Sequence, residues 1–215
     1  MRRLAETQHL EAPHGAIELL IEAPETAAEA RGIALVCHPH PLFGGTNTNK
    51  VVHTLARVFN NLGYITVRPN FRGVGSSSGE HDEGEGETDD MMQVLAYARE
   101  RFGDLPIVLA GFSFGAFVQT RVAERLAAEG RPAQRLVLVG TAAGYVEGSR
   151  QYAVGAVAPD TLIIHGSSDE TVPLSNVLAW AEPLELPVVV VPGADHFFHR
   201  RLHLIRDIIT RAWRH

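Results

Sequence analysis

A serine between two glycines is the clearest chemical signal in the sequence. The stretch LAGFSFGAF, residues 109–117, has the pattern G-x-S-x-G, with Ser113 directly after an apolar run and directly before a helical pattern. This pattern is typical of a nucleophile on a strained turn, where side chains at Gly111 and Gly115 would collide with the backbone. The following helix would direct its N-terminus at developing negative charge. The alternative is a turn of small residues that only packs a helix on a sheet.

A serine hydroxyl is a weak nucleophile unless a base takes its proton, and two later stretches offer the required partners. Asp169 lies in SSDETVP after the apolar run TLIIHG, and His196 lies in ADHFFH after PVVVVPG. Because both stretches follow expected parallel strands, we expect Ser113, Asp169 and His196 to meet at one edge of the sheet. Glu170 is the second choice for the acid, whereas Asp195 adjoins the histidine and is poorly placed to orient its ring.

The stretch VCHPHPLFGG, residues 36–45, alternates two histidines with two prolines where an apolar run ends. An H-x-H pair could bind a metal, but a catalytic zinc site needs at least three protein ligands. His81 and His165 are available, yet no second spaced cluster accompanies them. We therefore expect no metal and no cofactor, with His38 in a structural role and His165 in packing.

The elements that must position these residues alternate along the chain. Expected strands cover residues 16–23, 32–38, 64–69, 106–111, 134–140, 161–166 and 187–193, with a partner for the first near 5–11. Expected helices cover 50–62, the pattern of Met91, Val94, Leu95 and Ala98, a segment ending near 129, and residues 174–185 and 198–214. The central strands are nearly all apolar, as in a parallel sheet covered on both faces. His199 and His203 should lie one and two turns into the last helix, at its surface.

Composition limits the class of protein. The chain has 215 residues, 45% hydrophobic and 20% charged, with a net charge of −6, which fits one soluble domain over residues 1–215 and no nucleic-acid partner. Its single cysteine, Cys37, excludes an internal disulfide and reads as a buried apolar residue. Neither a secretory leader nor a membrane span is visible, so we expect a cytoplasmic protein with no membrane partner. Nothing in the sequence indicates an oligomeric state.

Five segments in order resemble the α/β-hydrolase superfamily, and within it a group of small bacterial serine hydrolases with little or no cap. They are CHPHPLFGGTNTNKVV, PNFRGVGSSSGE, LAGFSFGAF, HGSSDETVP and DHFFHR, and the resemblance runs from about residue 15 to 212. It implies an α/β-hydrolase fold with a mostly parallel central sheet, helices on both faces and no substantial lid. Related dehalogenases would carry Asp where Ser113 stands.

The resemblance also implies a role for the two prolines. Acyl transfer passes through an oxyanion that needs two N–H donors, of which one comes from the residue after the nucleophile, Phe114. Relatives place the other in a His-Gly-X loop, and matching HPH to that pattern makes the amide of His40 the donor. Pro39 replaces the usual glycine, and Leu42 is the second choice. The prolines on both sides lack an N–H and would hold the amide of His40 in place.

The activity implied is that of a serine hydrolase. We expect a carboxylesterase that cleaves small or short-chain acyl esters through a Ser113–His196–Asp169 triad and an acyl-enzyme. A peptidase, amidase or thioesterase on the same triad is the alternative, and a non-enzymatic binding protein of the same fold is a remote one. The expected partner is a small ester-like molecule.

Two further stretches bear on the substrate. Residues 141–160 are too few for a lid of several helices, and Phe43, Tyr145, Tyr152 and Phe198 are candidates for apolar walls. Residues 80–90, EHDEGEGETDD, hold seven carboxylates, read as a solvated loop with acidic residues at a helix N-terminus. At the mouth of the site these carboxylates would repel anionic esters, an effect that salt screens.

We predict that EDTA leaves hydrolytic activity unchanged, because the serine chemistry needs no metal. The measurement is the initial rate of ester hydrolysis before and after dialysis against the chelator. A strong loss that added zinc restores would instead support a metal site at His38 and His40.

Overall fold

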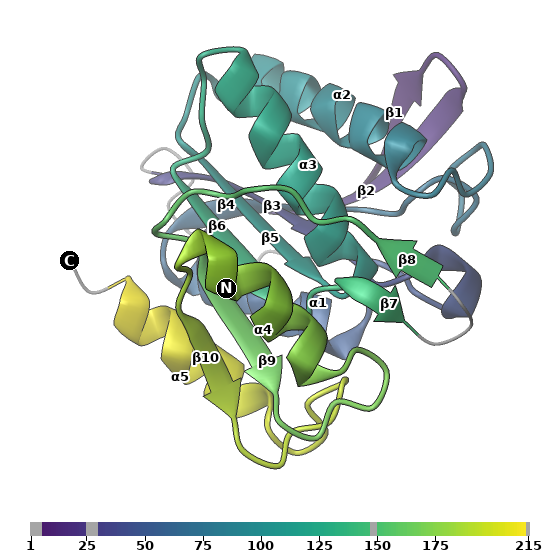
Figure 1. The fold of residues 1–215 in the computed structure, drawn as a ribbon. Helices are drawn as coiled ribbons and strands as arrows, with labels where there is room; N and C mark the ends of the chain where they lie inside the picture. Colours follow the sequence, from purple (N-terminus) through teal and green to yellow (C-terminus); the bar gives the residue numbers. More distant parts are fainter. Residues whose placement is uncertain (1–5, 25–29, 147–149, 214–215) are drawn as a thin grey trace.

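Eight strands form one sheet in the part of the chain that the computed structural model describes, residues 6–24, 30–146 and 150–213 (Figure 1). The strand order is β1-β2-β4-β3-β5-β6-β9-β10. The strands are β1 (Glu6–Ala12), β2 (Gly15–Glu22), β3 (Gly32–Cys37), β4 (Tyr64–Pro69), β5 (Ile107–Phe112), β6 (Arg135–Val139), β9 (Leu162–Gly166) and β10 (Val188–Val191). Each expected strand is present, with its ends displaced by at most two residues.

The sheet is parallel except at one side. From β4 to β10 every pair of neighbours is parallel, whereas β2 runs antiparallel to both β1 and β4. Parallel neighbours need a long crossover, and helices supply it after β3, β4, β5 and β9. The carboxyl ends of β5, β9 and β10 therefore lie at one edge of the sheet.

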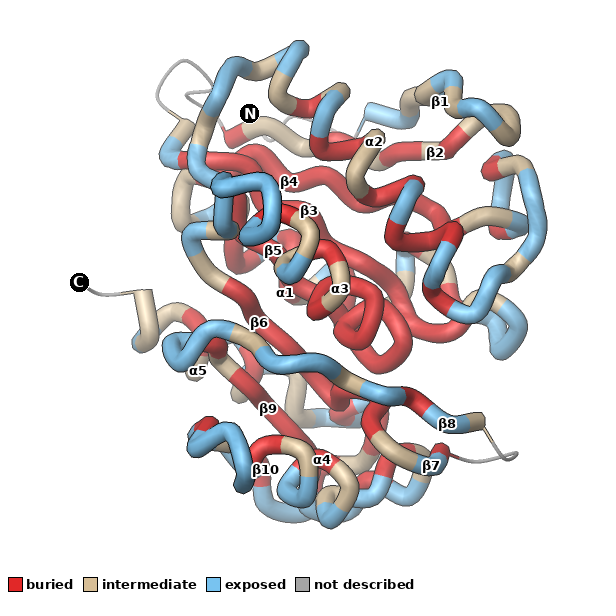
Figure 2. Tube along the Cα trace, turned by 45° about the horizontal axis from the view of Figure 1, so that its top comes forward, coloured by how far each residue is buried: buried red, intermediate tan, exposed pale blue. Residues whose placement is uncertain are grey.

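Among the described residues, five α-helices cover the two faces of this sheet (Figure 1). On one face lie α2 (Glu85–Phe102), α3 (Phe114–Ala128) and α4 (Leu174–Ala181), and on the other lie α1 (Lys50–Asn61) and α5 (Leu202–Ala212). The side chains of β3 alternate between the two cores, because successive residues of a strand point to opposite faces. Strands β3, β4 and β5 are buried at every residue, which explains their nearly continuous apolar sequence (Figure 2).

A small hairpin occupies part of the segment between β6 and β9. Strands β7 (Gly144–Val146) and β8 (Arg150–Tyr152) pair antiparallel beside the main sheet (Figure 1). The length of this segment predicts that it is too short for a lid of several helices, and no pattern in its sequence indicated the hairpin. The segment adds no helix over the sheet within the described residues.

The last helix begins later than expected, and this changes the position of two histidines. Phe198 and Arg200 have φ angles of 53° and 61°, in the left-handed region, so a helix cannot run through them. The prediction that His199 and His203 lie one and two turns into the helix was therefore wrong. His199 precedes the helix and pairs with Asp195, at 2.7 Å between Nδ1 and Oδ2, and His203 is in its first turn.

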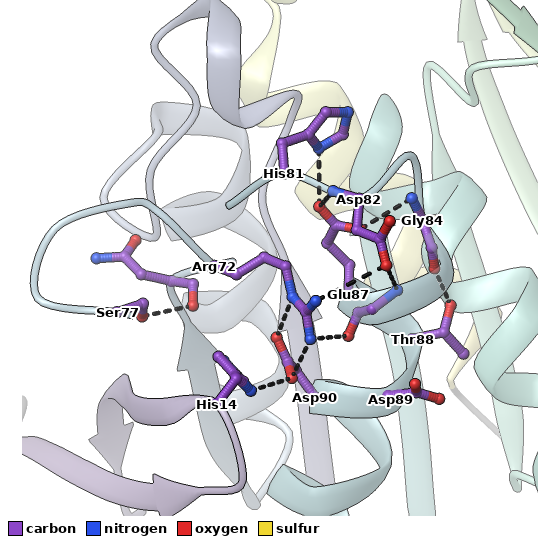
Figure 3. A network of polar contacts seen from close by, with 12 residues as sticks. His14, Arg72, Ser77, His81, Asp82, Gly84, Glu87, Thr88, Asp89 and Asp90 are labelled. Atoms are coloured by element: carbon purple, nitrogen blue, oxygen red, sulfur yellow. Dashed lines mark hydrogen bonds and ion pairs between the residues drawn. The ribbon is translucent and has the colours of Figure 1, made fainter. Parts of the chain in front are cut away.

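The acidic run is only partly solvated, contrary to expectation. Glu87 is fully buried in the first turn of α2. Its carboxylate accepts hydrogen bonds from the backbone N–H groups of Asp82 (3.0 Å) and Gly84 (2.8 Å), and it lies 2.7 Å from Nδ1 of His81 (Figure 3). These bonds satisfy N–H groups that would otherwise be unpaired at the helix start. Glu87 therefore fixes the loop that enters α2.

A second buried carboxylate holds the loop after β4. Arg72 donates from Nε and Nη2 to the two oxygens of Asp90, at 3.0 and 2.8 Å, and also to the carbonyl of Gly86 at 3.0 Å (Figure 3). A Cβ atom at Gly86 would lie 1.9 Å from Nη1 of Arg72, so a side chain there would displace the guanidinium from its present position. His14 lies 3.3 Å from the same carboxylate, which connects the β1–β2 turn to α2.

We predict that Asp90→Asn lowers the free energy of unfolding by about 2 to 3 kcal/mol, because it leaves the Arg72 guanidinium without its buried counter-charge. The matched control is Asp89→Asn, since Asp89 is exposed and pairs with Arg125 on the surface. That change should cost less than about 1 kcal/mol. Urea denaturation of the three proteins is the measurement, and equal losses for both variants would contradict the role of Asp90.

Candidate active site

Ser113 stands on a strained turn between β5 and α3. Its φ and ψ angles are 56° and −119°, a conformation that non-glycine residues rarely adopt. Four backbone hydrogen bonds hold it there. The N–H of Ser113 donates to the carbonyl of Val139 at 2.9 Å, and its own carbonyl accepts from Ala116, Phe117 and Ala142. The strain is thus offset by bonds from the first turn of α3, from the end of β6 and from the loop that follows β6.

The two glycines around Ser113 are required by close packing of the backbone. A Cβ atom at Gly111 would lie 2.4 Å from the carbonyl oxygen of Gly115. A Cβ atom at Gly115 would lie 2.4 Å from the carbonyl oxygen of His38, at the end of β3. The first turn of α3 is therefore pressed against the start of the HPHP loop.

The structure brings the three predicted residues into one chain of hydrogen bonds. Nε2 of His196 lies 3.0 Å from Oγ of Ser113, and Nδ1 of His196 lies 2.7 Å from Oδ2 of Asp169. Each residue follows a different strand, β5, β9 or β10, at the same edge of the sheet. All three are buried, with 5 to 7% of their surface exposed, so little water competes for these bonds.

The carboxylate of Asp169 is held in one orientation by its own loop. Its Oδ1 accepts hydrogen bonds from the N–H groups of Thr171 (3.0 Å) and Val172 (2.8 Å), which leaves Oδ2 for His196. His165 lies behind it, with Nε2 2.9 Å from the Val172 carbonyl and 3.4 Å from Oδ2 of Asp169. Burial lowers the pKa of His165, so it stays neutral beside the carboxylate. The sequence indicated only packing for this histidine.

His38 anchors the loop that follows β3. Its Nε2 accepts the N–H of Phe71 at 2.9 Å, and its Nδ1 lies 2.6 Å from the Pro39 carbonyl. A backbone N–H can only donate and a carbonyl can only accept, so Nδ1 carries the proton. Burial lowers the pKa of His38 to about 4, which keeps it neutral. Both ring nitrogens are used in the fold, as the structural role expected for this residue requires.

The backbone N–H of His40 is the predicted oxyanion donor, and His40 lines the pocket that contains Ser113. In the turns, loops and caps of the described residues, the N–H groups of His40 and Phe114 donate to no backbone carbonyl. Both residues line the same pocket as Ser113. The N–H of Leu42, the second choice for an oxyanion donor, is directed at Nδ1 of His40 at 3.3 Å. Burial, with the charges of His81 and Arg150, lowers the pKa of the His40 ring to about 4.

The pocket in front of Ser113 has a volume of about 210 Å³. Most of its wall is apolar or aromatic, from Phe43, Phe114, Ala142, Val146, Tyr152 and Phe197. The prediction was wrong for two of the expected wall residues. Tyr145 is exposed to solvent, and Phe198 is fully buried in the core beneath α5. Phe197 takes the place expected for Phe198, and the single-residue shift carries no signal in the sequence.

The charge at the pocket also differs from expectation. No carboxylate of residues 80–90 lines the pocket, although His81 packs against the ring of His40 with centroids 4.6 Å apart. The acidic run was therefore wrongly placed at the mouth. Arg150 of β8 lines the pocket instead, and a lone arginine within residues 141–160 was the only sequence signal for it.

His38 and His40 face different partners and do not converge on one point. Within the described residues, no group of three or more His, Cys, Asp or Glu side chains is arranged to bind a metal ion. In the same residues, no helix is long and apolar enough to cross a bilayer. Cys37 is fully buried, and burial raises the pKa of its thiol, so it stays protonated.

Comparison with known proteins identifies the family. Residues 35–153, more than half of the chain, match the family model of the α/β-hydrolase fold. The chain belongs to the α/β-hydrolase family. Its lid-less architecture is shared with solved structures of bacterial serine hydrolases.

An α/β serine hydrolase homologue from Coxiella burnetii is 38% identical, with a TM-score of 0.81 over 97% of both chains. XC6422 from Xanthomonas campestris, an α/β serine hydrolase without a lid, is 35% identical, with a TM-score of 0.85 over 98% of this chain and 94% of that one. The lysophosphatidylserine lipase ABHD12 of Danio rerio is 34% identical over 84 residues, 39% of this chain and 22% of the lipase. The full-length relatives support a hydrolase.

We predict that His40→Pro lowers kcat about 10² to 10³-fold relative to His40→Ala, because proline removes the N–H and alanine keeps it. The φ angle of His40 is −52°, which proline also adopts, so the substitution changes the donor more than the backbone. Steady-state kinetics of both variants on one activated ester is the measurement. If both variants keep the wild-type kcat, the His40 amide is not an oxyanion donor. If both variants lose kcat equally and strongly, the imidazole itself acts.

Proposed function

We propose that this protein is a serine carboxylesterase that cleaves small esters through an acyl-enzyme. The observation that carries the proposal is the hydrogen-bond chain from Oγ of Ser113 through His196 to Asp169. Ser113 and His196 line a mostly apolar pocket. Each member has the partner that its chemical role needs. The chain belongs to the α/β-hydrolase family, and the solved structures that it resembles are serine hydrolases. This similarity supports the same reaction.

Acylation begins with proton transfer from Ser113 to Nε2 of His196, while Oγ attacks the ester carbonyl carbon. Because Nδ1 of His196 donates to Asp169, Nε2 is free of its proton and can accept one. The imidazolium formed in this step is stabilised by the Asp169 carboxylate. It then donates its Nε2 proton to the leaving alkoxide as the C–O bond breaks.

The carbonyl oxygen gains a negative charge in the tetrahedral intermediate, and we propose that the amides of His40 and Phe114 donate to it. Water then replaces the alcohol, and His196 takes a proton from it so that hydroxide attacks the acyl-enzyme carbonyl. Collapse of the second intermediate returns the proton to Ser113 and releases the acid. Atoms balance as ester plus water giving acid plus alcohol.

The pocket favours small substrates. Its volume of about 210 Å³ is below the ~300–1,000 Å³ usual for ligand pockets. The hairpin β7–β8 borders it without a helical cap, so a long acyl chain would remain in water. We therefore propose acetate to butyrate esters as better substrates than decanoate esters.

We predict that the protein hydrolyses p-nitrophenyl acetate and butyrate and that Ser113→Ala lowers kcat/KM by about 10⁴-fold or more. The control is Ser175→Ala, an exposed serine on α4, which should retain wild-type rates. The measurement is the initial rate over a series of acyl lengths, beside aminoacyl p-nitroanilides and acyl thioesters. Labelling by a fluorophosphonate, located at Ser113 by mass spectrometry, reports the nucleophile directly.

Three outcomes would contradict the proposal. Wild-type rates in folded Ser113→Ala would exclude the serine mechanism. Faster turnover of anilides or thioesters than of matched esters would assign an amidase or a thioesterase. Better turnover of decanoate than of butyrate would contradict the small, uncapped site.

A further inference from the structure

We propose that His81 is a positioning residue that keeps the two proposed oxyanion donors, the amides of His40 and Phe114, aligned with each other. This inference deepens the proposed function and rests on it. His81 does not line the pocket that contains Ser113, so it would act through the two residues that do. The observation that carries the inference is that the His81 ring contacts both of them and is itself bonded to a fully buried carboxylate.

Three aromatic rings meet beside the proposed oxyanion donors. The centroid of the His81 ring is 4.6 Å from that of His40 and 5.2 Å from that of Phe114, and the centroids of His40 and Phe114 are 5.0 Å apart. Each ring thus contacts the other two within the range of aromatic pairs. His40 follows β3, His81 lies between β4 and α2, and Phe114 begins α3. The three rings therefore connect three segments that are far apart in the chain.

The His81 ring is anchored by Glu87, in the first turn of α2. Nδ1 of His81 lies 2.7 Å from Oε1 of Glu87 (Figure 3). The same carboxylate accepts the N–H of Asp82 on Oε1 at 3.0 Å and that of Gly84 on Oε2 at 2.8 Å, and its side chain is fully buried. A carboxylate bonded at both oxygens cannot turn without leaving backbone N–H groups unpaired. The His81 ring is therefore bonded to a fixed group.

The side chain of His40 connects the position of His81 to the proposed donor. Nδ1 of His40 accepts the N–H of Leu42 at 3.3 Å, so the ring is bonded to the loop whose amide is the proposed donor. Burial, with the charges of His81 and Arg150, lowers the pKa of this ring to about 4. The His40 ring therefore stays neutral and packs against His81 without repulsion between two cations. Because interior side chains are close-packed, a displaced His81 ring would displace the His40 ring.

This alignment matters most for the charged intermediate. Oxyanion donors stabilise the tetrahedral intermediate when they lie about 2.7–3.1 Å from its oxygen. The unreacted ester depends more on the walls of the pocket, of which His81 is not part. A misplaced donor therefore lowers kcat while KM changes little. A role confined to the stability of the loop that enters α2 would lower the free energy of unfolding without this selectivity.

A pair of inhibitors separates the two roles. Oγ of Ser113 adds to the carbonyl carbon of 1,1,1-trifluoropentan-2-one, the carbonyl oxygen takes the electron pair of the double bond, and the hydroxyl proton passes to His196. The unfluorinated ketone, 2-pentanone, has the same carbon chain and forms no such stable adduct. The ratio of the two inhibition constants therefore measures stabilisation of the oxyanion. Comparing this ratio between variant and wild type cancels the intrinsic reactivity of the ketones.

We predict that His81→Ala lowers kcat for p-nitrophenyl butyrate about 10- to 100-fold, less than the largest loss expected for removal of a whole donor. Inhibition by the trifluoroketone should weaken by the same factor. KM and inhibition by 2-pentanone should stay near their wild-type values. His81→Phe keeps a ring and loses the bond to Glu87, so we expect a loss of about 5-fold in kcat and in inhibition by the trifluoroketone.

The matched control is His14→Ala. His14 also pairs with a buried carboxylate of α2, that of Asp90 at 3.3 Å, but it lies in the β1–β2 turn and does not line the pocket. This variant should keep the wild-type kcat and the wild-type ratio of inhibition constants. Urea denaturation of each variant shows that it folds.

Wild-type kcat and inhibition in folded His81→Ala would overturn the inference while leaving the esterase proposal intact. Equal weakening of both ketones, or the same loss of kcat in His14→Ala, would also overturn it, because either result indicates a general effect on the fold. If His81→Ala does not fold, His81→Phe decides, and wild-type values in that variant overturn the inference.

Absence of ester turnover by the wild type would instead count against the esterase. In that case calorimetry with the two ketones decides the role of His81. A preference of the wild type for the trifluoroketone that falls in His81→Ala supports the inference. Equal binding of both ketones by the wild type, or an unchanged preference in the variant, overturns it.

Discussion

The close contact between the first turn of α3 and the end of β3 is the constraint on which the site depends. Gly115 lies so near the carbonyl oxygens of Cys37 and His38 that no side chain fits between them. This contact sets the distance between the turn that carries Ser113 and the loop that carries His40. His40, Ser113 and Phe114, from segments that lie far apart in the chain, therefore line one pocket.

Three buried histidines take different roles here because their hydrogen-bond partners differ. Both ring nitrogens of His38 form hydrogen bonds with the backbone, which anchors the loop after β3. His165 is buried against the back of Asp169, while His196 has one nitrogen on that carboxylate and the other on Ser113. Of these three histidines, only His196 combines a fixed proton on one ring nitrogen with a hydroxyl at the other. The environment, and not the residue type, makes it the candidate base.

The charges of the molecule are divided between structure and site. Glu87 and Asp90 are turned inward and bonded to the loop that enters α2 and to Arg72, so they fix the fold. Arg150, carried on the small hairpin, is at the pocket mouth. A chain with a net charge of −6 can thus carry a positive group at the pocket that contains Ser113. Net charge is a poor guide to the field at one site, because the nearest charges dominate it.

The sequence by itself determined the alternation of strands and helices and the order of Ser113, Asp169 and His196 along it. These depend on local patterns: apolar strands, helical periodicity, and a glycine-flanked turn that allows one backbone path. The edge of the sheet where the three residues meet then follows from parallel topology.

Only the tertiary structure decided which neighbours the remaining residues meet. The burial of Glu87 and Asp90, the choice of Phe197 over Phe198 as a wall, and the place of Arg150 all depend on contacts between distant segments. The start of α5 depends on the left-handed backbone at Phe198 and Arg200, which no local pattern announces. Periodicity reports which face of an element is buried, but it does not report what that face is buried against.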